Sequence, residues 1–102
     1  MATACNRVLL AGTLARDAEM RYTARGDSIA RITLSIARPD DPKADDRIPL
    51  EIRGPLTVKV EGIRRGRAVL VEGRIRIGST TLSSGRTGRA PVVEVTRLSL
   101  LD

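Results

Sequence analysis

The sequence predicts an all-β protein, a small barrel of five strands with one short helix. Several segments are rich in Val, Ile and Leu and alternate between apolar and polar residues, which is typical of half-buried strands. Only one segment has the apolar spacing of a helix, and turns containing Gly, Pro or Asp separate the strands. With 102 residues, the chain is long enough for one hydrophobic core but not two, so we expect a single domain over residues 1–102.

The first predicted strand covers residues 6–16, and Gly12 in its middle suggests a bend or bulge that lets a small sheet curl. Residues 17–27 form a connection that ends in the turn Arg25-Gly26-Asp27, where glycine supplies a positive φ. Residues 28–38 then alternate as a second strand. One face carries Ala30, Ile32, Leu34 and Ile36, and the other carries Ile29, Arg31, Thr33 and Ser35.

Residues 39–47 contain two prolines and four aspartates, and this composition predicts a solvated loop. We expect these aspartates to be solvated and not to hold a metal ion. Residues 48–53 alternate again as a third strand. Its inward residues are predicted to be Ile48, Leu50 and Ile52, and its outward residues Glu51 and Arg53.

Residues 55–63 form the helical candidate, because Leu56, Val60 and Ile63 share one helical face and Pro55 suits a first turn. A fourth strand is predicted over residues 68–77, a hairpin tip over 78–90, and a last strand over 91–101. The order is three strands, a short helix and two strands. That is the order of the five-stranded OB barrel, whose helix lies between strands three and four.

The net charge of +6 indicates a polyanionic partner, chiefly nucleic acid. Of the eighteen basic residues, all but Lys43 and Lys59 are arginine, which suits phosphate forks and stacking on bases. A bias of the coding sequence toward G and C would also enrich arginine. The aromatic content does not favour a nucleic-acid partner, because Tyr22 is the single aromatic residue of the chain on which a base could stack.

Catalysis and cofactors find no support in the residue types. The chain has no histidine to act as a base near neutral pH, its one cysteine, Cys5, has no partner for a disulfide or a multi-cysteine metal site, and no phosphate-binding glycine loop occurs. We therefore expect a protein that is not an enzyme, has no catalytic residues and needs no cofactor or metal. The first residues lack a signal-peptide pattern and no apolar run is long enough to cross a membrane, so we expect a cytoplasmic protein without a membrane partner.

Two blocks of sequence resemble the bacterial single-stranded DNA-binding protein family. The first is residues 6–14 with Arg16-Asp17, Arg21-Tyr22-Thr23 and the strand from Ile29 to Ser35. The second is Arg65-Gly66-Arg67-Ala68-Val69-Leu70-Val71-Glu72-Gly73-Arg74-Ile75-Arg76. The resemblance covers nearly the whole chain, and the two blocks together are fairly specific. It implies an OB barrel that binds single-stranded DNA and associates with itself.

The chain also departs from that family. The places where the family stacks bases on aromatic rings hold, by our reading, Asp40, Arg47, Arg53 and Thr80. Each base–aromatic contact contributes roughly 1–3 kcal/mol, so we expect weaker binding. The sequence ends at Asp102 without the acidic tail that recruits partner enzymes. A short, tailless, ring-poor relative resembles the primosomal replication protein N group as well as a divergent paralogue of the binding protein.

An arginine-lined groove is the predicted binding site. In an OB fold the second and third strands and the loops joining strands one to two and four to five form the ligand face. Tyr22 is either the one remaining stacking ring or, as we favour, a packing element. We also expect Glu51 to hold Arg53, and Glu72 to hold Arg74, in surface ion pairs. The predicted site residues are Arg31, Arg47, Arg53, Arg74, Arg76, Arg86, Arg89 and Tyr22.

The predicted function is non-catalytic binding of single-stranded DNA in replication, recombination or repair, with little sequence preference. RNA stays open as a ligand, because the same groove accepts either backbone. The alternative is an oligomerisation or protein-interaction module of the replication-restart machinery, the primosome, with weak DNA binding. Ile29, Leu70 and Leu98 are predicted to be exposed, which suggests a homodimer or homotetramer, and replication or repair proteins are the other expected partners.

Overall fold

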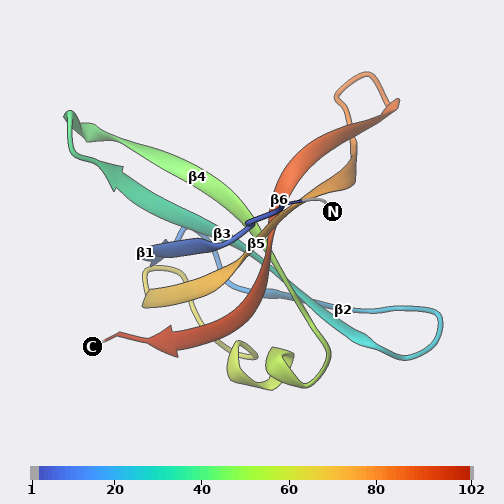
Figure 1. The fold of residues 1–102 in the computed structure, drawn as a ribbon. Coiled ribbons are helices and arrows are strands. Elements are labelled where there is room, and N and C mark those ends of the chain that lie inside the picture. The colour runs from blue at the N-terminus through green and yellow to red at the C-terminus, as the bar shows by residue number, and fades with distance from the viewer. Residues whose placement is uncertain (1–2, 102) are drawn as a thin grey trace.

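Six strands and one 3-10 helix form the structure, a computed structural model that describes residues 3–101 (Figure 1). The elements are β1 (Val8–Leu14), β2 (Glu19–Tyr22), β3 (Ser28–Arg38), β4 (Asp41–Arg53), the 3-10 helix η1 (Gly54–Lys59), β5 (Ala68–Thr81) and β6 (Thr87–Leu100). They are connected by short turns, with the exception of the segment between η1 and β5.

Five of the strands close into a barrel, which confirms the predicted OB architecture. The hydrogen-bonded order is β1-β5-β6-β4-β3, and pairing of β1 with β3 closes the ring. All of these contacts are antiparallel except the short parallel contact between β4 and β6, at Leu50 with Val93 and Glu51 with Glu94. The sixth strand, β2, lies within the predicted connection 17–27 and pairs only with the start of β3.

The barrel core consists of aliphatic side chains from β1, β3, β4, β5, β6 and the residue that follows η1. The predicted inward faces are confirmed, because Ala30, Ile32 and Leu34 are buried on β3 and Leu50 and Ile52 are buried on β4. The remaining core residues are Leu14, Val60, Val69, Val71, Val93, Val95 and Leu98. A small core of this kind is filled by branched aliphatic side chains rather than by rings.

The prediction that Leu98 is exposed is wrong, since the side chain is only 5% exposed and belongs to the core. Ile29 and Leu70 are half-buried. On β6 the strand register shifts opposite the step from Glu72 to Gly73, so that Arg97 and Val95 become consecutive partners of β5. A shift of this kind changes which residues face the core, and simple alternation along the sequence does not reveal it.

Gly12 is required where β1 crosses β3. A Cβ atom at this position would collide with the backbone carbonyl oxygen of Ser35. The closure of the barrel brings these two backbones together, at the register pairs Thr13–Ser35 and Leu14–Leu34. The predicted bend at Gly12 is thus the place where the sheet closes on itself.

The prediction of a loop over residues 39–47 is wrong, because β4 begins at Asp41 and pairs with β3 along this stretch. Only Pro39 and Asp40 lie between the two strands. The register jumps from Asp45 to Asp41 at a bulge, which removes Pro42 from the ladder and makes the missing N–H harmless. Ser35 donates a side-chain hydrogen bond to the carboxylate of Asp45 across the hairpin.

The predicted helix over residues 55–63 is a 3-10 helix that ends at Lys59. Thr57, Val58 and Val60 are poor helix formers, and the short segment does not develop an α-helical turn. Its apolar side still packs as predicted. Val60 is buried in the core, and Leu56 and Ile63 pack against it.

The last hairpin is longer than predicted. Residues 78–90 were expected to form its tip, whereas β5 and β6 stay paired as far as Thr81 and Thr87 and leave only Leu82–Arg86 as the turn. Figure 1 shows this hairpin and the β3–β4 hairpin projecting from the same side of the barrel. Across residues 3–101, none of the helical structure is long and apolar enough to cross a membrane.

Candidate functional site

A cleft of about 490 Å³ lies where the loop after β1 and the outer faces of β3 and β4 meet those of β5 and β6. Its position agrees with the predicted ligand face. Its lining combines charged and polar residues with apolar ones. The lining residues are Arg16, Asp17, Glu19, Arg31, Ile32, Thr33, Pro49, Leu50, Glu51, Arg53, Arg76, Gly78, Ser79, Ala90, Pro91 and Val92.

The cleft brings together three of the predicted site residues, Arg31, Arg53 and Arg76. They come from β3, β4 and β5, so segments distant in the sequence supply one charged surface. Arg16 is a fourth arginine of the cleft and is not among the predicted site residues. Its position just after the first strand, on the loop that the OB fold uses for ligands, was the available signal.

Three arginines and two glutamates form a continuous chain of ion pairs, which we call the arginine–glutamate network. Arg53 Nε and an Arg76 terminal nitrogen both donate to Glu51 Oε1, at 2.7 and 2.8 Å. Arg76 Nε also donates to Glu94 Oε2 at 3.2 Å, and Arg74 donates to Glu94 Oε1 at 2.8 Å. Arg76 therefore lies at the centre and joins β5 to both β4 and β6.

The parallel contact between β4 and β6 explains why the network forms. Glu51 and Glu94 are register partners in this contact, so two carboxylates lie beside each other on the outer face of the sheet. Like charges in this position destabilise a sheet unless a cation separates them. Arg76 supplies that cation, and the Glu51 side chain beneath it is only 9% exposed.

Hydrogen bonds from the network also shift the pKa of Glu94. The bond donated by Arg74 lowers the pKa below its usual value of 4.5, and the positive charges of Arg74 and Arg76 act in the same direction, while partial burial opposes the shift. Glu94 therefore remains ionised at neutral pH and keeps both arginines engaged.

The predicted pairing of Glu51 with Arg53 is confirmed, but the pairing of Glu72 with Arg74 is wrong. Glu72 instead pairs with Arg7 at 3.0 Å, and Arg74 turns to Glu94. The reason is the register of β5 on β6, which places Arg74 opposite Glu94. The sequence pattern suggests a partner two residues away on the same strand, whereas the partner of Arg74 lies on the neighbouring strand.

Arg47 lies outside the cleft. It is on β4 toward the β3–β4 turn and pairs with Asp45 at 3.6 Å. The hydrogen bond from Ser35 lowers the pKa of Asp45, with Arg47 contributing in the same direction.

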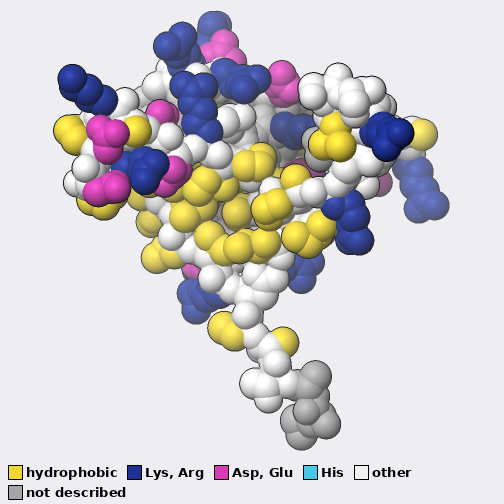
Figure 2. Space-filling model, turned by 90° about the horizontal axis from the view of Figure 1, so that it is seen from above, with side chains coloured by type: hydrophobic (Ala, Val, Ile, Leu, Met, Phe, Trp, Pro, Cys, Tyr) yellow, Lys and Arg dark blue, Asp and Glu magenta, His cyan; other side chains and the backbone are white. Residues whose placement is uncertain are grey.

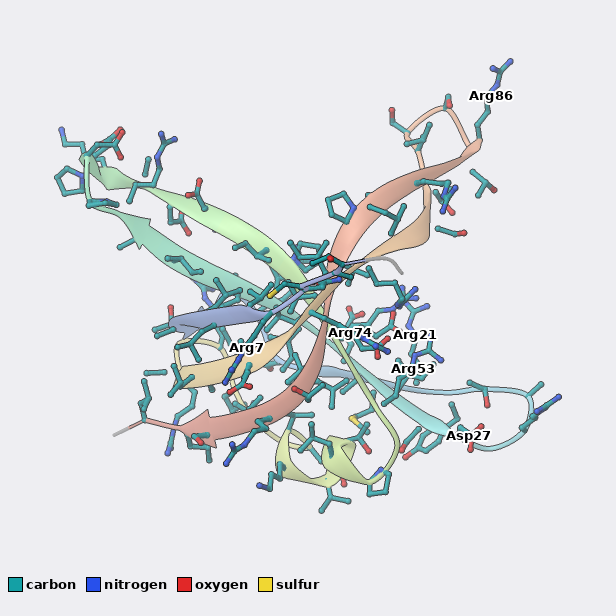
Figure 3. The ribbon with its side chains drawn as sticks, in the orientation of Figure 1. Arg7, Arg21, Asp27, Arg53, Arg74 and Arg86 are labelled. Carbon is teal, nitrogen blue, oxygen red and sulfur yellow. The ribbon has the colours of Figure 1, made fainter. Side chains whose placement is uncertain are left out.

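Arg86 and Arg89 belong to the far end of the β5–β6 hairpin, and Figure 3 shows Arg86 at its tip, away from the barrel. Both side chains are exposed and make no ion pair within residues 3–101. Tyr22 is not among the residues that line the cleft. At 68% exposed it does not have the packing role that we favoured for it.

The surface seen from above combines apolar and basic regions. Figure 2 shows apolar side chains gathered at the centre of this face, with Lys and Arg side chains around its edge. On the strands, Ile75 and Ile77 are 48% and 51% exposed because the upper part of β5 extends beyond the barrel.

Comparison with known protein families identifies one that matches nearly the whole chain. Residues 5–101 match the model of the single-strand binding protein family. The match covers all six strands and η1.

Several individual proteins are similar over most of the chain, all of them called single-stranded DNA-binding proteins. The protein from Thermus aquaticus is 34% identical over 98 residues, which are 93% of this chain and 37% of the relative. The protein from Thermotoga maritima is 30% identical over 104 residues, which are 95% of this chain and 74% of the relative. The protein from Halalkalibacterium halodurans is 35% identical over 95 residues, which are 88% of this chain and 55% of the relative. The chain thus spans little more than a third of the length of the Thermus relative.

Proposed function

The chain belongs to the single-strand binding protein family, and on that premise we propose that it binds single-stranded DNA in the cleft between β3–β4 and β5–β6, without catalysing a reaction. Binding would serve DNA replication, recombination or repair. The observation that carries the proposal is the cleft itself, where Arg16, Arg31, Arg53 and Arg76 meet from four segments of the chain.

The chemistry of these side chains accounts for the mode of binding. Guanidinium groups neutralise phosphates and release counterions, and this attraction is independent of sequence. Their flat faces also stack on bases, which partly replaces the aromatic rings that the family uses. Arg31 and Arg16 make no ion pair within residues 3–101, so they are the arginines of the cleft most available to phosphate.

Fluorescence anisotropy of a labelled oligo-dT, titrated with the protein at several salt concentrations, tests the proposal. We expect binding that weakens as salt rises and that unlabelled duplex DNA competes away poorly. Arg31→Glu should weaken binding about tenfold or more, because it replaces an attractive charge with a repulsive one in the cleft.

Lys59→Glu is the matched control. It makes the same change of charge, but Lys59 lies at the end of η1 and does not line the cleft. We expect the affinity for oligo-dT to change by less than about twofold, because only the net charge of the protein changes. Equal losses of affinity in Arg31→Glu and Lys59→Glu would mean that the cleft is not the binding site.

A second candidate function is a protein-interaction or oligomerisation module of the replication-restart machinery. It is favoured by the arginine–glutamate network, which neutralises much of the charge of Arg53, Arg74 and Arg76, and by the position of Tyr22 outside the cleft. Binding to oligo-dT that vanishes near physiological salt would support this second candidate.

A further inference from the structure

The carboxylates of the arginine–glutamate network occupy hydrogen-bond donors of Arg53 and Arg76, which line the cleft, and of Arg74, two residues before Arg76 on β5. Arg76 uses its Nε and one terminal nitrogen on Glu94 and Glu51. Arg53 uses its Nε, and Arg74 uses one terminal nitrogen. A guanidinium binds phosphate through the same fork of N–H groups that it offers to a carboxylate. Phosphate and carboxylate therefore compete for these three arginines.

The two glutamates also act at a distance. Glu51 lines the cleft, and its charge repels any phosphate that approaches Arg53 or Arg76. Together, Arg16, Arg31, Arg53 and Arg76 face Asp17, Glu19 and Glu51, so four cations of the cleft are opposed by three carboxylates. The local field is much weaker than the arginine content of the sequence suggests.

We propose that Glu51 and Glu94 are affinity-setting residues, which limit how tightly the protein holds the phosphodiester backbone of a single strand. They compete with phosphate for Arg53 and Arg76, which line the cleft, and for Arg74 beside it. The inference rests on the proposed binding of single-stranded DNA. It divides the arginines into two classes. Arg16 and Arg31 are open to the ligand from the start, whereas each network arginine already gives one or two of its five N–H groups to a carboxylate.

Amide variants of the two glutamates separate charge from structure. Glu51→Gln and Glu94→Gln keep an oxygen that accepts the arginine hydrogen bonds but remove the competing charge. We expect each variant to bind labelled oligo-dT about three- to tenfold more tightly than the wild type at low salt. The slope of log affinity against log salt should become steeper by about one unit, as for one additional phosphate contact.

Glu61→Gln is the control for net charge. Glu61 is exposed just after η1, lies outside the cleft and takes part in no ion pair within residues 3–101. It should change affinity by less than about twofold. Circular dichroism melting confirms that the variants are folded. Glu94 is more exposed than Glu51, so Glu94→Gln provides the test if Glu51→Gln fails to fold.

The outcomes separate this inference from the function on which it rests. If the wild type binds oligo-dT but neither folded amide variant binds more tightly than Glu61→Gln, the carboxylates do not compete with phosphate and the inference is overturned. If the wild type and all variants fail to bind, the proposed function fails and the inference fails with it.

Discussion

Single residues in this protein show that the number of arginines is a poor measure of the charge offered to a ligand. Arg31 and Arg76 line the same cleft, yet Arg31 makes no ion pair within residues 3–101 while Arg76 contacts two carboxylates. Neighbouring carboxylates alone do not explain the difference, because Glu19 and Glu51 are the register partners of Arg31 on β2 and β4. Arg76 lies beside the two glutamates that the parallel β4–β6 contact places together. It donates hydrogen bonds to both of them.

The lowered pKa of Glu94 predicts that the free energy of unfolding falls at acid pH. The hydrogen bond from Arg74 lowers the pKa of Glu94 in the folded protein below its usual 4.5, and the unfolded chain retains the usual value. The resulting stabilisation is present above about pH 4.5 and is lost as the pH falls through the folded pKa. We expect the wild type to exceed Glu94→Gln in unfolding free energy by about 1 kcal/mol at pH 6, and this gap to shrink toward pH 3.

Urea unfolding at pH 6, 5, 4 and 3 measures this gap. Glu61→Gln is measured alongside, so that the general effect of removing one carboxylate can be subtracted. A gap between the wild type and Glu94→Gln that is the same at pH 6 and pH 3 would contradict the stabilising role of the ionised Glu94.

The strands as elements extend further than their local composition indicates. The acidic start of β4 and the polar ends of the β5–β6 hairpin contain residues that favour turns, yet both are paired with a neighbouring strand. Each pairing satisfies backbone groups of both strands, which outweighs weak intrinsic preferences. These extensions matter for the proposed function, because Gly78, Ser79, Ala90 and Pro91 of the extended hairpin form one wall of the cleft.

The crossing of β1 and β3 predicts a large effect of a small substitution. In Gly12→Val, the new Cβ would meet the carbonyl oxygen of Ser35, and one of the two backbones has to move. We expect a loss of about 2 kcal/mol or more in unfolding free energy, because overpacking against a backbone cannot be relieved by a rotamer change. Chemical denaturation measures the loss.

Ala11→Val is the matched control for that substitution. It introduces the same side chain one residue earlier, at an exposed position on the other face of β1. The expected change is within about 0.5 kcal/mol. Equal losses of unfolding free energy in Gly12→Val and Ala11→Val would mean that the close approach of β1 and β3 does not restrict the side chain at position 12.

The whole molecule exposes apolar side chains that its own core does not use. Leu9, Ile75, Ile77 and Leu82 are exposed on β1 and on the β5–β6 hairpin, and Ile75 and Ile77 lie on the same face of β5. The residues from which self-association was predicted are different, since Leu98 belongs to the core. Exposed apolar residues that gather on one face are typical of interaction surfaces.

Self-association therefore stays a prediction, now for a different surface. We expect the wild type to sediment as a dimer or tetramer at micromolar concentration, and Ile75→Ser with Ile77→Ser to shift it toward the monomer by exposing less apolar area. Analytical ultracentrifugation measures the masses. Val58→Ser removes a similarly exposed residue from η1 and should leave the oligomer intact. A monomeric wild type would contradict the prediction.

The sequence by itself determined the barrel class, the inward faces of β3 and β4 and a bend at Gly12, and it predicted that Arg31, Arg53 and Arg76 share one face. These features follow from local alternation, turn chemistry and the order of elements, which the chain carries along its length. The tertiary structure decided the lengths of the two projecting hairpins, the burial of Leu98 and the partners of the arginines. Those features depend on strand register and on the parallel β4–β6 contact, which bring residues far apart in sequence together. Glu94 is the plainest case, because it joins the arginine–glutamate network only when β6 lies between β4 and β5.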